Sequence, residues 1–166
     1  MNASSARAVC LDASVLVKLR IEEPYSQQVR DWCSSEHGAY TTPFCFYEAL
    51  NIFKSKWKFQ GKIVHSEYVS ACNSLIAWFG GISRRGLVKD PELTSHEAFS
   101  SVREIATSTG LDFSDAYQLY SVKHGYFSVL ARDSRTVLAT TDGELAQAAR
   151  SLGLLAVNLS VEHVAS

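Results

Sequence analysis

Hydrophobic and polar positions follow two different patterns along the chain. Continuous apolar runs at residues 8–11, 137–140 and 154–159 are typical of short strands that are buried on both faces. Longer segments between them carry apolar residues at i, i+3 and i+4, which is typical of helices with one buried face. Strands that alternate with helices predict an α/β fold: a single domain over residues 1–166, built as a three-layer sandwich around a short central parallel sheet.

Helix boundaries are indicated by capping and stop residues. Thr42 and Pro43 open a long helix that runs to about Phe59, and Thr94–Glu97 has the form of a capping box. Residues 126–135 show no clear pattern. We expect helices at 14–21, 25–35, 43–59, 65–79, 95–109, 112–123 and 142–152, and strands at 8–11, 39–41, 87–89, 137–140 and 154–159.

Two acidic residues stand where predicted strands end. Asp12 follows the first strand directly, and Asp142 follows the strand at 137–140 after Thr141. The carboxyl ends of parallel strands emerge on one edge of a sheet, where ligand sites form in such folds. Each acid also has a structural interpretation, because Asp is a preferred N-cap of the helix that follows. Both interpretations stay open for both residues.

Two further acids fall in the early turns of predicted helices. Glu48 shares a helix face with Phe44 and Ile52, where a carboxylate is costly unless it is paired, bound to metal or able to reach solvent at the helix edge. Asp112 is placed as an N-cap, and Asp115 lies three residues later. Asp115 is therefore either part of the cap or part of a site.

Together, Asp12, Glu48, Asp115 and Asp142 form a candidate cluster at one edge of the sheet. Four carboxylates in one pocket repel each other unless some are protonated or a cation lies between them. Oxygen ligands suit Mg²⁺ or Mn²⁺, and the lack of an accompanying histidine cluster argues against zinc.

Composition narrows the possible partners and compartments. Hydrophobic residues make up 46% and charged residues 20% of the chain, and no apolar run reaches the roughly 18 residues that cross a membrane. The four separate cysteines and the absence of a secretory signal at residues 1–7 indicate a cytoplasmic protein.

A net charge of −1 gives no general attraction to nucleic acid, so a polyanion must meet a local patch or bound metal. Basic residues concentrate in Lys54, Lys56, Lys58, Lys62, Arg84 and Arg85, which is equally the composition of a solvated helix end.

Four segments of the chain resemble the signature segments of PIN domains: Leu11–Val17, Tyr47–Leu50, Leu111–Ala116 and Ala139–Leu145. They occur in the order of that family and span nearly the whole chain. The resemblance implies that the acidic quartet Asp12, Glu48, Asp115 and Asp142 is catalytic and binds metal, with Ser14 and Thr141 as auxiliary polar residues.

The resemblance also implies an activity and partners. The chain is similar to single-domain VapC-like toxins, which predicts a Mg²⁺- or Mn²⁺-dependent endoribonuclease with an RNA substrate, a small antitoxin protein as candidate partner, and a candidate homodimer. Lys54, Lys58, Arg84 and Arg85 are the candidate RNA contacts. The chain is longer than most such proteins, with the extra length at residues 62–92 and 126–135.

Two alternatives remain from the sequence. One is a catalytically inactive PIN-like domain that serves as a binding or assembly module. The other is a phosphatase of the haloacid dehalogenase type, which also begins with an Asp at a strand end. Such an enzyme needs a second acid two residues later, and this chain has Ser14 there.

Overall fold

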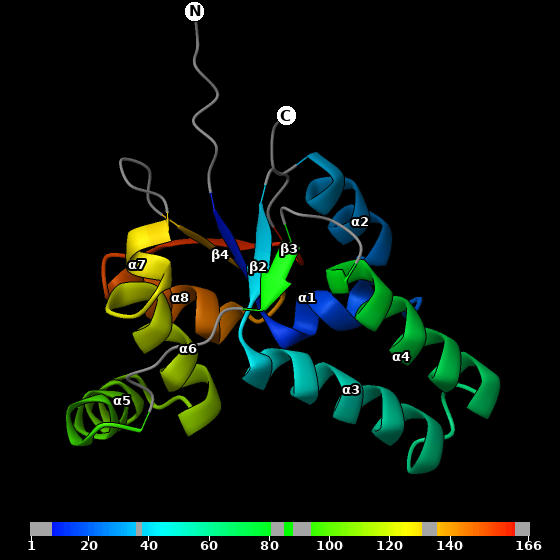
Figure 1. The fold of residues 1–166 in the computed structure, drawn as a ribbon, viewed down its shortest axis with the longest axis horizontal. Coiled ribbons are helices and arrows are strands. Elements are labelled where there is room, and N and C mark those ends of the chain that lie inside the picture. Colours follow the sequence, from blue (N-terminus) through cyan, green and yellow to red (C-terminus); the bar gives the residue numbers. More distant parts are fainter. Residues whose placement is uncertain (1–7, 36–37, 81–84, 88–93, 131–135, 162–166) are drawn as a thin grey trace, which may run out of the picture.

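A five-stranded, all-parallel sheet lies at the centre of the computed structural model, with helices on both sides (Figure 1). The structure describes residues 8–35, 38–80, 85–87, 94–130 and 136–161. The strand order is β3-β2-β1-β4-β5, which confirms the predicted α/β sandwich with a short parallel sheet. The strands are β1 (Val9–Leu11), β2 (Ala39–Thr41), β3 (Arg85–Leu87), β4 (Val137–Thr140) and β5 (Leu155–Asn158).

The helices fall close to their predicted positions, except for the short helix at Phe127–Leu130, which the sequence pattern did not predict. They are α1 (Ala13–Lys18), α2 (Ser26–Ser35), α3 (Pro43–Lys58), α4 (His65–Gly80), α5 (His96–Thr109), α6 (Phe113–Lys123), α7 (Phe127–Leu130) and α8 (Gly143–Ser151). No helix of the described part is both long enough and apolar enough to cross a membrane.

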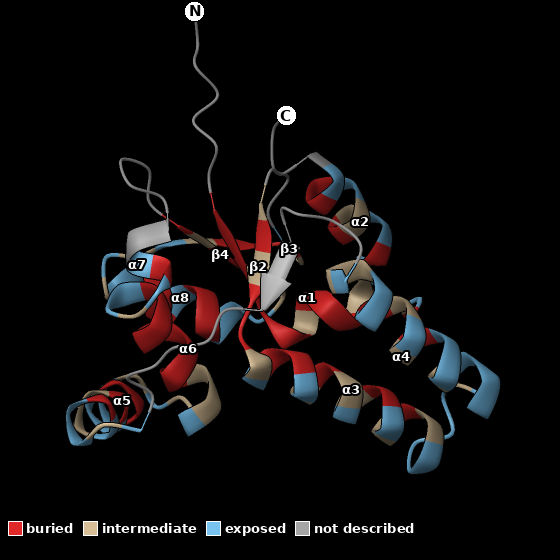
Figure 2. Cartoon of the chain, viewed as in Figure 1, coloured by how far each residue is buried: buried red, intermediate tan, exposed pale blue. Residues whose placement is uncertain are grey.

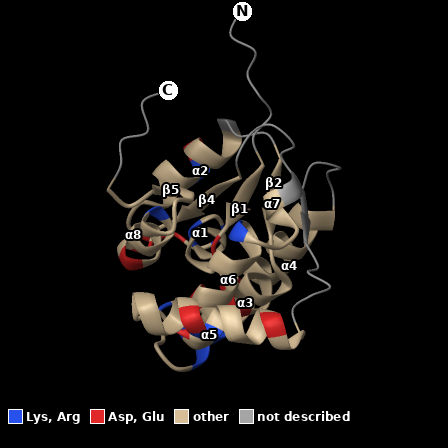
Figure 3. Ribbon diagram, turned by 90° about the vertical axis from the view of Figure 1, so that its left-hand side faces the viewer, with Lys and Arg blue, Asp and Glu red and all other residues tan. Residues whose placement is uncertain are grey.

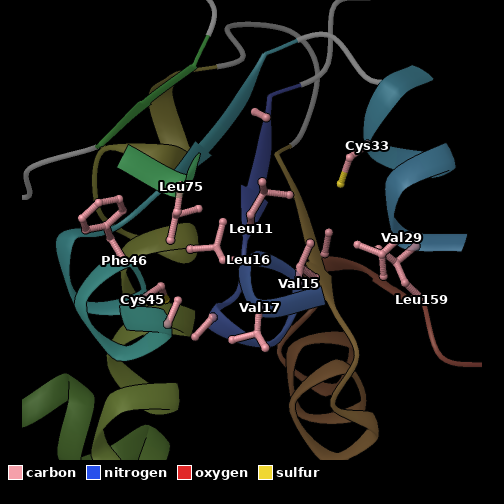
Figure 4. Packing of buried hydrophobic residues seen from close by; sticks show 14 of the residues in the cluster. Leu11, Val15, Leu16, Val17, Val29, Cys33, Cys45, Phe46, Leu75 and Leu159 are labelled. Atoms are coloured by element: carbon pink, nitrogen blue, oxygen red, sulfur yellow. The ribbon is translucent and has the colours of Figure 1, made fainter. Parts of the chain in front are cut away.

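The two sheet faces have separate hydrophobic cores, and successive residues of β1 alternate between them. Val9 and Leu11 pack with α1 to α4 in a first core, to which Phe53 also belongs. Figure 4 shows Leu11 and Leu16 in this core. Cys10 packs on the other face with α5, α6, α7 and α8. The buried stripes of the helices face the sheet and their exposed faces point outward (Figure 2).

Several boundaries differ from the predictions. The third strand lies at 85–87 and not at 87–89, and residues 88 and 89 are outside the described part. Helix α1 begins at Ala13 with Asp12 as its N-cap, where Ser14 was expected to start it. The cap of α5 is Ser95 and not Thr94, because Ser95 Oγ accepts the N–H of Ala98 at 3.0 Å. Ser is the better N-cap of the two residue types, in keeping with its position at the start of α5.

The extra length at residues 62–92 is partly core. Helix α4 occupies residues 65–80 and packs along α3, with Ala71 and Leu75 buried in the first core. Residues 126–130 contain α7, whose Phe127 is fully buried in the second core. The parts of these segments at 81–84, 88–93 and 131–135 lie outside the described residues.

A buried ammonium group ties α3 to the connection between α1 and α2. Lys56, in the last turns of α3, is buried, and its Nζ donates to Glu23 Oε1. Lys18 Nζ of α1 donates to the other oxygen of Glu23 at 3.1 Å. Burial raises the pKa of the Glu23 carboxyl, but the hydrogen bonds from both lysines outweigh it and leave the pKa below its usual value. Lys56 therefore belongs to the interior and not to the basic surface group expected from the sequence.

We expect Glu23→Gln to destabilise the protein by about 3 kcal/mol at pH 7, because it leaves the Lys56 ammonium buried without a carboxylate. The loss is measured by urea unfolding. A carboxyl with a lowered folded pKa stabilises the fold above the unfolded pKa of about 4.3, and this contribution disappears as the pH falls through the folded pKa. The difference between the variant and the wild type should therefore shrink below about pH 4.

The control is Glu22→Gln, which removes the exposed pair of Glu22 with Arg30 (2.8 Å). Exposed pairs contribute at most about 1 kcal/mol, so this variant should be nearly neutral. Equal losses in the two variants would contradict a structural role for the buried pair.

Candidate functional site

The Asp12 carboxylate is buried at the end of β1 and held by hydroxyl groups. Its Oδ2 accepts hydrogen bonds from Ser14 Oγ at 2.5 Å and from Thr140 Oγ1 at 2.9 Å. The backbone N–H of Ser14 also donates to it at 3.3 Å, so Asp12 is the N-cap of α1 as well. Burial raises the pKa of Asp12, although these hydrogen bonds oppose the rise.

Thr140 is the residue that connects the two strand-end acids, and the sequence interpretation missed it. Its hydroxyl donates to Asp12 and accepts the backbone N–H of Asp142 at 2.9 Å. Thr141, the residue expected to supply a hydroxyl, contributes its backbone N–H to Ser14 Oγ at 3.0 Å. The signal in the sequence is a hydroxyl residue that ends an otherwise apolar strand. The structure shows that this residue, Thr140, is fully buried.

Asp142 lies at the same edge and caps α8. Its Oδ1 accepts the N–H groups of Glu144 at 2.8 Å and Leu145 at 3.1 Å. The capping interpretation is therefore correct for Asp142. The side chain is exposed, in contrast to the buried Asp12.

Glu48 faces the start of α6 from the second turn of α3. It is half-buried, and its Oε2 accepts the hydroxyl of Ser114 at 3.2 Å. Burial raises the pKa of Glu48, and the negative charges of Asp12 and Asp112 raise it further. No sequence pattern singles out Ser114, because its contact with Glu48 depends on how α3 and α6 are placed.

The two acids at the start of α6 have different surroundings. Asp112 is the predicted N-cap, with Oδ1 accepting the N–H of Asp115 at 2.9 Å. Burial raises the pKa of Asp115 to about 7, together with the charges of Asp12, Asp112, Glu48 and Asp142. Asp115 therefore lies within electrostatic reach of all three other members of the predicted quartet.

The four acidic side chains are not arranged to coordinate a single metal ion in this structure. Within the described residues, no three His, Cys, Asp or Glu side chains are arranged to hold one metal ion. The charges of Asp12, Glu48 and Asp142 act on Asp115, whose pKa is raised, yet the Asp12 and Asp142 carboxylates are turned toward hydroxyl groups and helix N–H groups. Mutual repulsion keeps unpaired carboxylates apart. The oxygen-only donor set fits a hard divalent cation in its chemistry, and side-chain rotation would be needed to complete a shell.

Neighbouring thiols are unsuited to nucleophilic catalysis. Burial raises the pKa of the Cys45 thiol to about 12, with the Asp12 and Glu48 charges adding to the effect. Burial also raises the pKa of Cys10 well above its usual value. Both groups stay neutral thiols at physiological pH, and the thiolate is the reactive form.

The predicted RNA contacts are described in part. Lys54 and Lys58 are exposed on α3. Arg84 lies outside the described residues, and Arg85 is described only as backbone in β3. Lysine and arginine are otherwise spread over several elements with acids among them (Figure 3), in keeping with the net charge of −1.

Comparison with known proteins shows likeness in fold. No protein-family model matches the sequence, and no curated protein sequence matches it. The crystal structure of FitAcB from Neisseria gonorrhoeae is similar with a TM-score of 0.56 and 16% identity, over 93% of this chain and 99% of that chain. FitAB bound to an IR36 DNA fragment is similar with a TM-score of 0.54 and 17% identity, over 95% of this chain and 99% of that chain. These chains share an α/β fold with the protein over nearly its whole length.

The raised pKa of Asp115 predicts that replacing this carboxyl by a neutral amide stabilises the fold at high pH and not at low pH. An acid whose folded pKa is raised binds its proton more tightly in the folded state, so stability falls as the pH rises from about 4 to 7. We expect metal-free Asp115→Asn to melt at a higher temperature than the wild type at pH 8. The two melting temperatures should converge near pH 4, as measured by thermal unfolding in a chelator.

Asp112 should behave differently, because its side chain caps α6. Asp112→Ala should cost about 0.5–2 kcal/mol of unfolding free energy, whereas Asp112→Ser should be nearly neutral. Urea unfolding of both variants measures this. A loss in Asp112→Ser as large as in Asp112→Ala would show that the carboxylate charge, and not the cap, stabilises the helix.

Proposed function

We propose that the protein is a metal-dependent endoribonuclease whose acidic quartet is Asp12, Glu48, Asp115 and Asp142. The observation that carries the proposal is the gathering of these acids at one edge of the sheet: Thr140 bridges Asp12 and the backbone of Asp142, and Ser114 beside Asp115 donates to Glu48. Burial and the charges of Asp12, Asp112, Glu48 and Asp142 raise the pKa of Asp115 there. Groups with strongly shifted pKa values in a cluster are characteristic of functional sites. The PIN-like signature segments and the fold shared with FitAcB and FitAB support the same function.

A bound Mg²⁺ or Mn²⁺ would supply a water activated for attack and positive charge at the phosphate. The protein's own groups position that chemistry. Ser14 and Thr140 orient Asp12, and Ser114 orients Glu48. A cation in the cluster would favour the deprotonated form of Asp115, because it would offset the burial and the negative charges that raise the pKa of this carboxyl.

The two alternatives make different demands on the same residues. An inactive binding module could use Asp12 and Asp142 as helix caps, but it has no use for Asp115, whose charge is opposed by those of Asp12, Glu48 and Asp142 unless a cation is bound. A phosphatase of the haloacid dehalogenase type needs an acid where Ser14 stands. Here Ser14 Oγ donates to Asp12 and accepts from Thr141, which makes it a positioning residue. Cleavage of RNA compared with a phosphate monoester distinguishes the three functions.

For its partner, we propose a small antitoxin protein that binds DNA, with this chain as the toxin. FitAB, which is similar in fold, is bound to a DNA fragment in its structure. Co-expression with the product of an adjacent small open reading frame tests this: toxicity that the neighbour relieves supports the pairing, and toxicity that it leaves unchanged contradicts it.

The function is tested with Mn²⁺ in two measurements. We expect Mn²⁺ to raise the melting temperature of the wild type, because binding to the folded state alone stabilises by about 2.7 kcal/mol at a hundredfold excess over the dissociation constant. Single-stranded RNA should be cleaved only when Mg²⁺ or Mn²⁺ is present. Asp115→Asn should lose both responses while staying folded.

The matched control is Asp31→Asn, an exposed acid on α2, which lies away from the starts of α3 and α6 (Figure 1); this variant should keep both responses. Cleavage that persists in excess chelator, or in Asp115→Asn, would contradict the metal mechanism. An unchanged melting curve up to millimolar Mn²⁺ would argue for the inactive module.

A further inference from the structure

The outward face of α3 carries an ordered set of side chains that the acidic quartet does not use. Phe44, Tyr47, Asn51, Lys54 and Lys58 follow one another at spacings of three and four residues, which places them along one side of the helix. All five are exposed. Glu48 lies beside the aromatic end of this face, so the face begins at the acidic cluster.

The aromatic end of this face is unusually exposed. Phe44 is 51% and Tyr47 64% exposed, and Phe113 at the first position of α6 is 63% exposed. The Phe44 ring packs against Tyr117 of α6 with ring centroids 5.4 Å apart, so one side of it is held in place. Large aromatic residues left open beside a polar cluster are typical of a binding site.

An open pocket lies at this position. It has a volume of about 660 Å³ and is lined by Pro43, Phe44, Tyr47, Glu48, Asn51 and Ser114. Two aromatic rings and a proline line it, together with three polar groups: the Asn51 amide, the Ser114 hydroxyl and the Glu48 carboxylate. Flat apolar walls with a few polar groups at the rim suit a nucleobase, which stacks with its face and forms hydrogen bonds with its edge.

The other end of the face is positively charged. Glu48 is the sole acid within α3, and Lys54 and Lys58 follow on the same side. Tyr47 and Lys58 are separated by eleven residues, roughly 16 Å along the helix axis. A strand that placed a base on Tyr47 would therefore carry its next phosphates past the two ammonium groups.

We propose that this face of α3 is the binding track for the single-stranded RNA that flanks the cleaved phosphate. One unpaired nucleobase occupies the pocket between Phe44 and Tyr47, and Lys54 and Lys58 bind the backbone beyond it. The proposal rests on the proposed ribonuclease function, and it adds the requirement that the RNA be unpaired at this position. A partner protein is less suited, because Asn51 and two lysines interrupt the apolar surface.

The track is tested by RNA binding in an Asp115→Asn background, so that the RNA stays intact. Anisotropy of a short fluorescein-labelled single-stranded RNA should show that Tyr47→Ala weakens binding by roughly 5- to 150-fold, the range for loss of one base stack. Tyr47→Trp should restore binding. Tyr126→Ala, a matched exposed tyrosine after α6, should leave it unchanged.

The basic end is tested by the salt dependence of the same binding. Removing two phosphate contacts from a single strand lowers the slope of log affinity against log salt by about 1.4. The double variant Lys54→Gln, Lys58→Gln should show this decrease. A duplex of the same sequence should bind more weakly than the single strand and should not respond to Tyr47→Ala.

Failure of the track is distinguishable from failure of the proposed function. If the wild type cleaves RNA but Tyr47→Ala leaves RNA affinity unchanged, the track is wrong and the ribonuclease function stands. If the Tyr47-dependent binding is found without metal-dependent cleavage, the track stands and the ribonuclease function is wrong. If Tyr47→Ala changes the sedimentation of the protein and not its RNA affinity, the face is an interface between two copies of the chain, which overturns the track.

Discussion

The parallel pairing of β1 with β4 is the constraint on which the candidate site depends. Leu11 pairs with Ala139, so the residues that follow the two strands meet although they are far apart in sequence. The backbone N–H of Asp12 donates to Ala139 O at 3.0 Å, and Thr140 Oγ1 reaches the Asp12 carboxylate. A shift of one residue in this register would turn Thr140 to the opposite face of the sheet and remove its hydrogen bond to Asp12.

Helix capping and the acidic cluster use the same residues. Asp12, Asp112 and Asp142 cap α1, α6 and α8, whose N-termini all open at the carboxyl edge of the sheet. The partial positive charge of a helix N-terminus offsets part of the cost of a nearby carboxylate. This offset helps the fold to tolerate several acids in one place. The Asp115 carboxylate caps no helix, and burial, together with the charges of Asp12, Asp112, Glu48 and Asp142, raises its pKa to about 7.

The sequence predicted those features that local patterns determine. Apolar runs and caps located nearly every helix and strand, and the strand-end positions of Asp12 and Asp142 placed them at one edge correctly. Features that depend on packing between distant elements were missed. Ser114 is near Glu48 because α3 and α6 lie side by side there, and Lys56 is buried because Glu23 reaches it from the α1–α2 connection. Thr141 was predicted in place of Thr140, because the sequence does not show that the strand ends at Thr140 with its side chain buried while Thr141 lies beyond the strand.

One side of helix α3 packs into the protein and the other carries the exposed polar and charged residues, and the packing of the first determines the position of the second. Its inward side is fixed by the buried Phe53 in the first core and by the pair of Lys56 with Glu23. Glu48 lies at the edge of its outward side, beside the acidic cluster, and Lys58 is exposed on that side near the opposite end. Since an α-helix is stiff over this length, fixing Phe53 and Lys56 also fixes the distance and direction from Glu48 to the exposed lysines. The contacts that hold α3 in the fold are therefore the ones that align an acidic end with a basic end along a single surface.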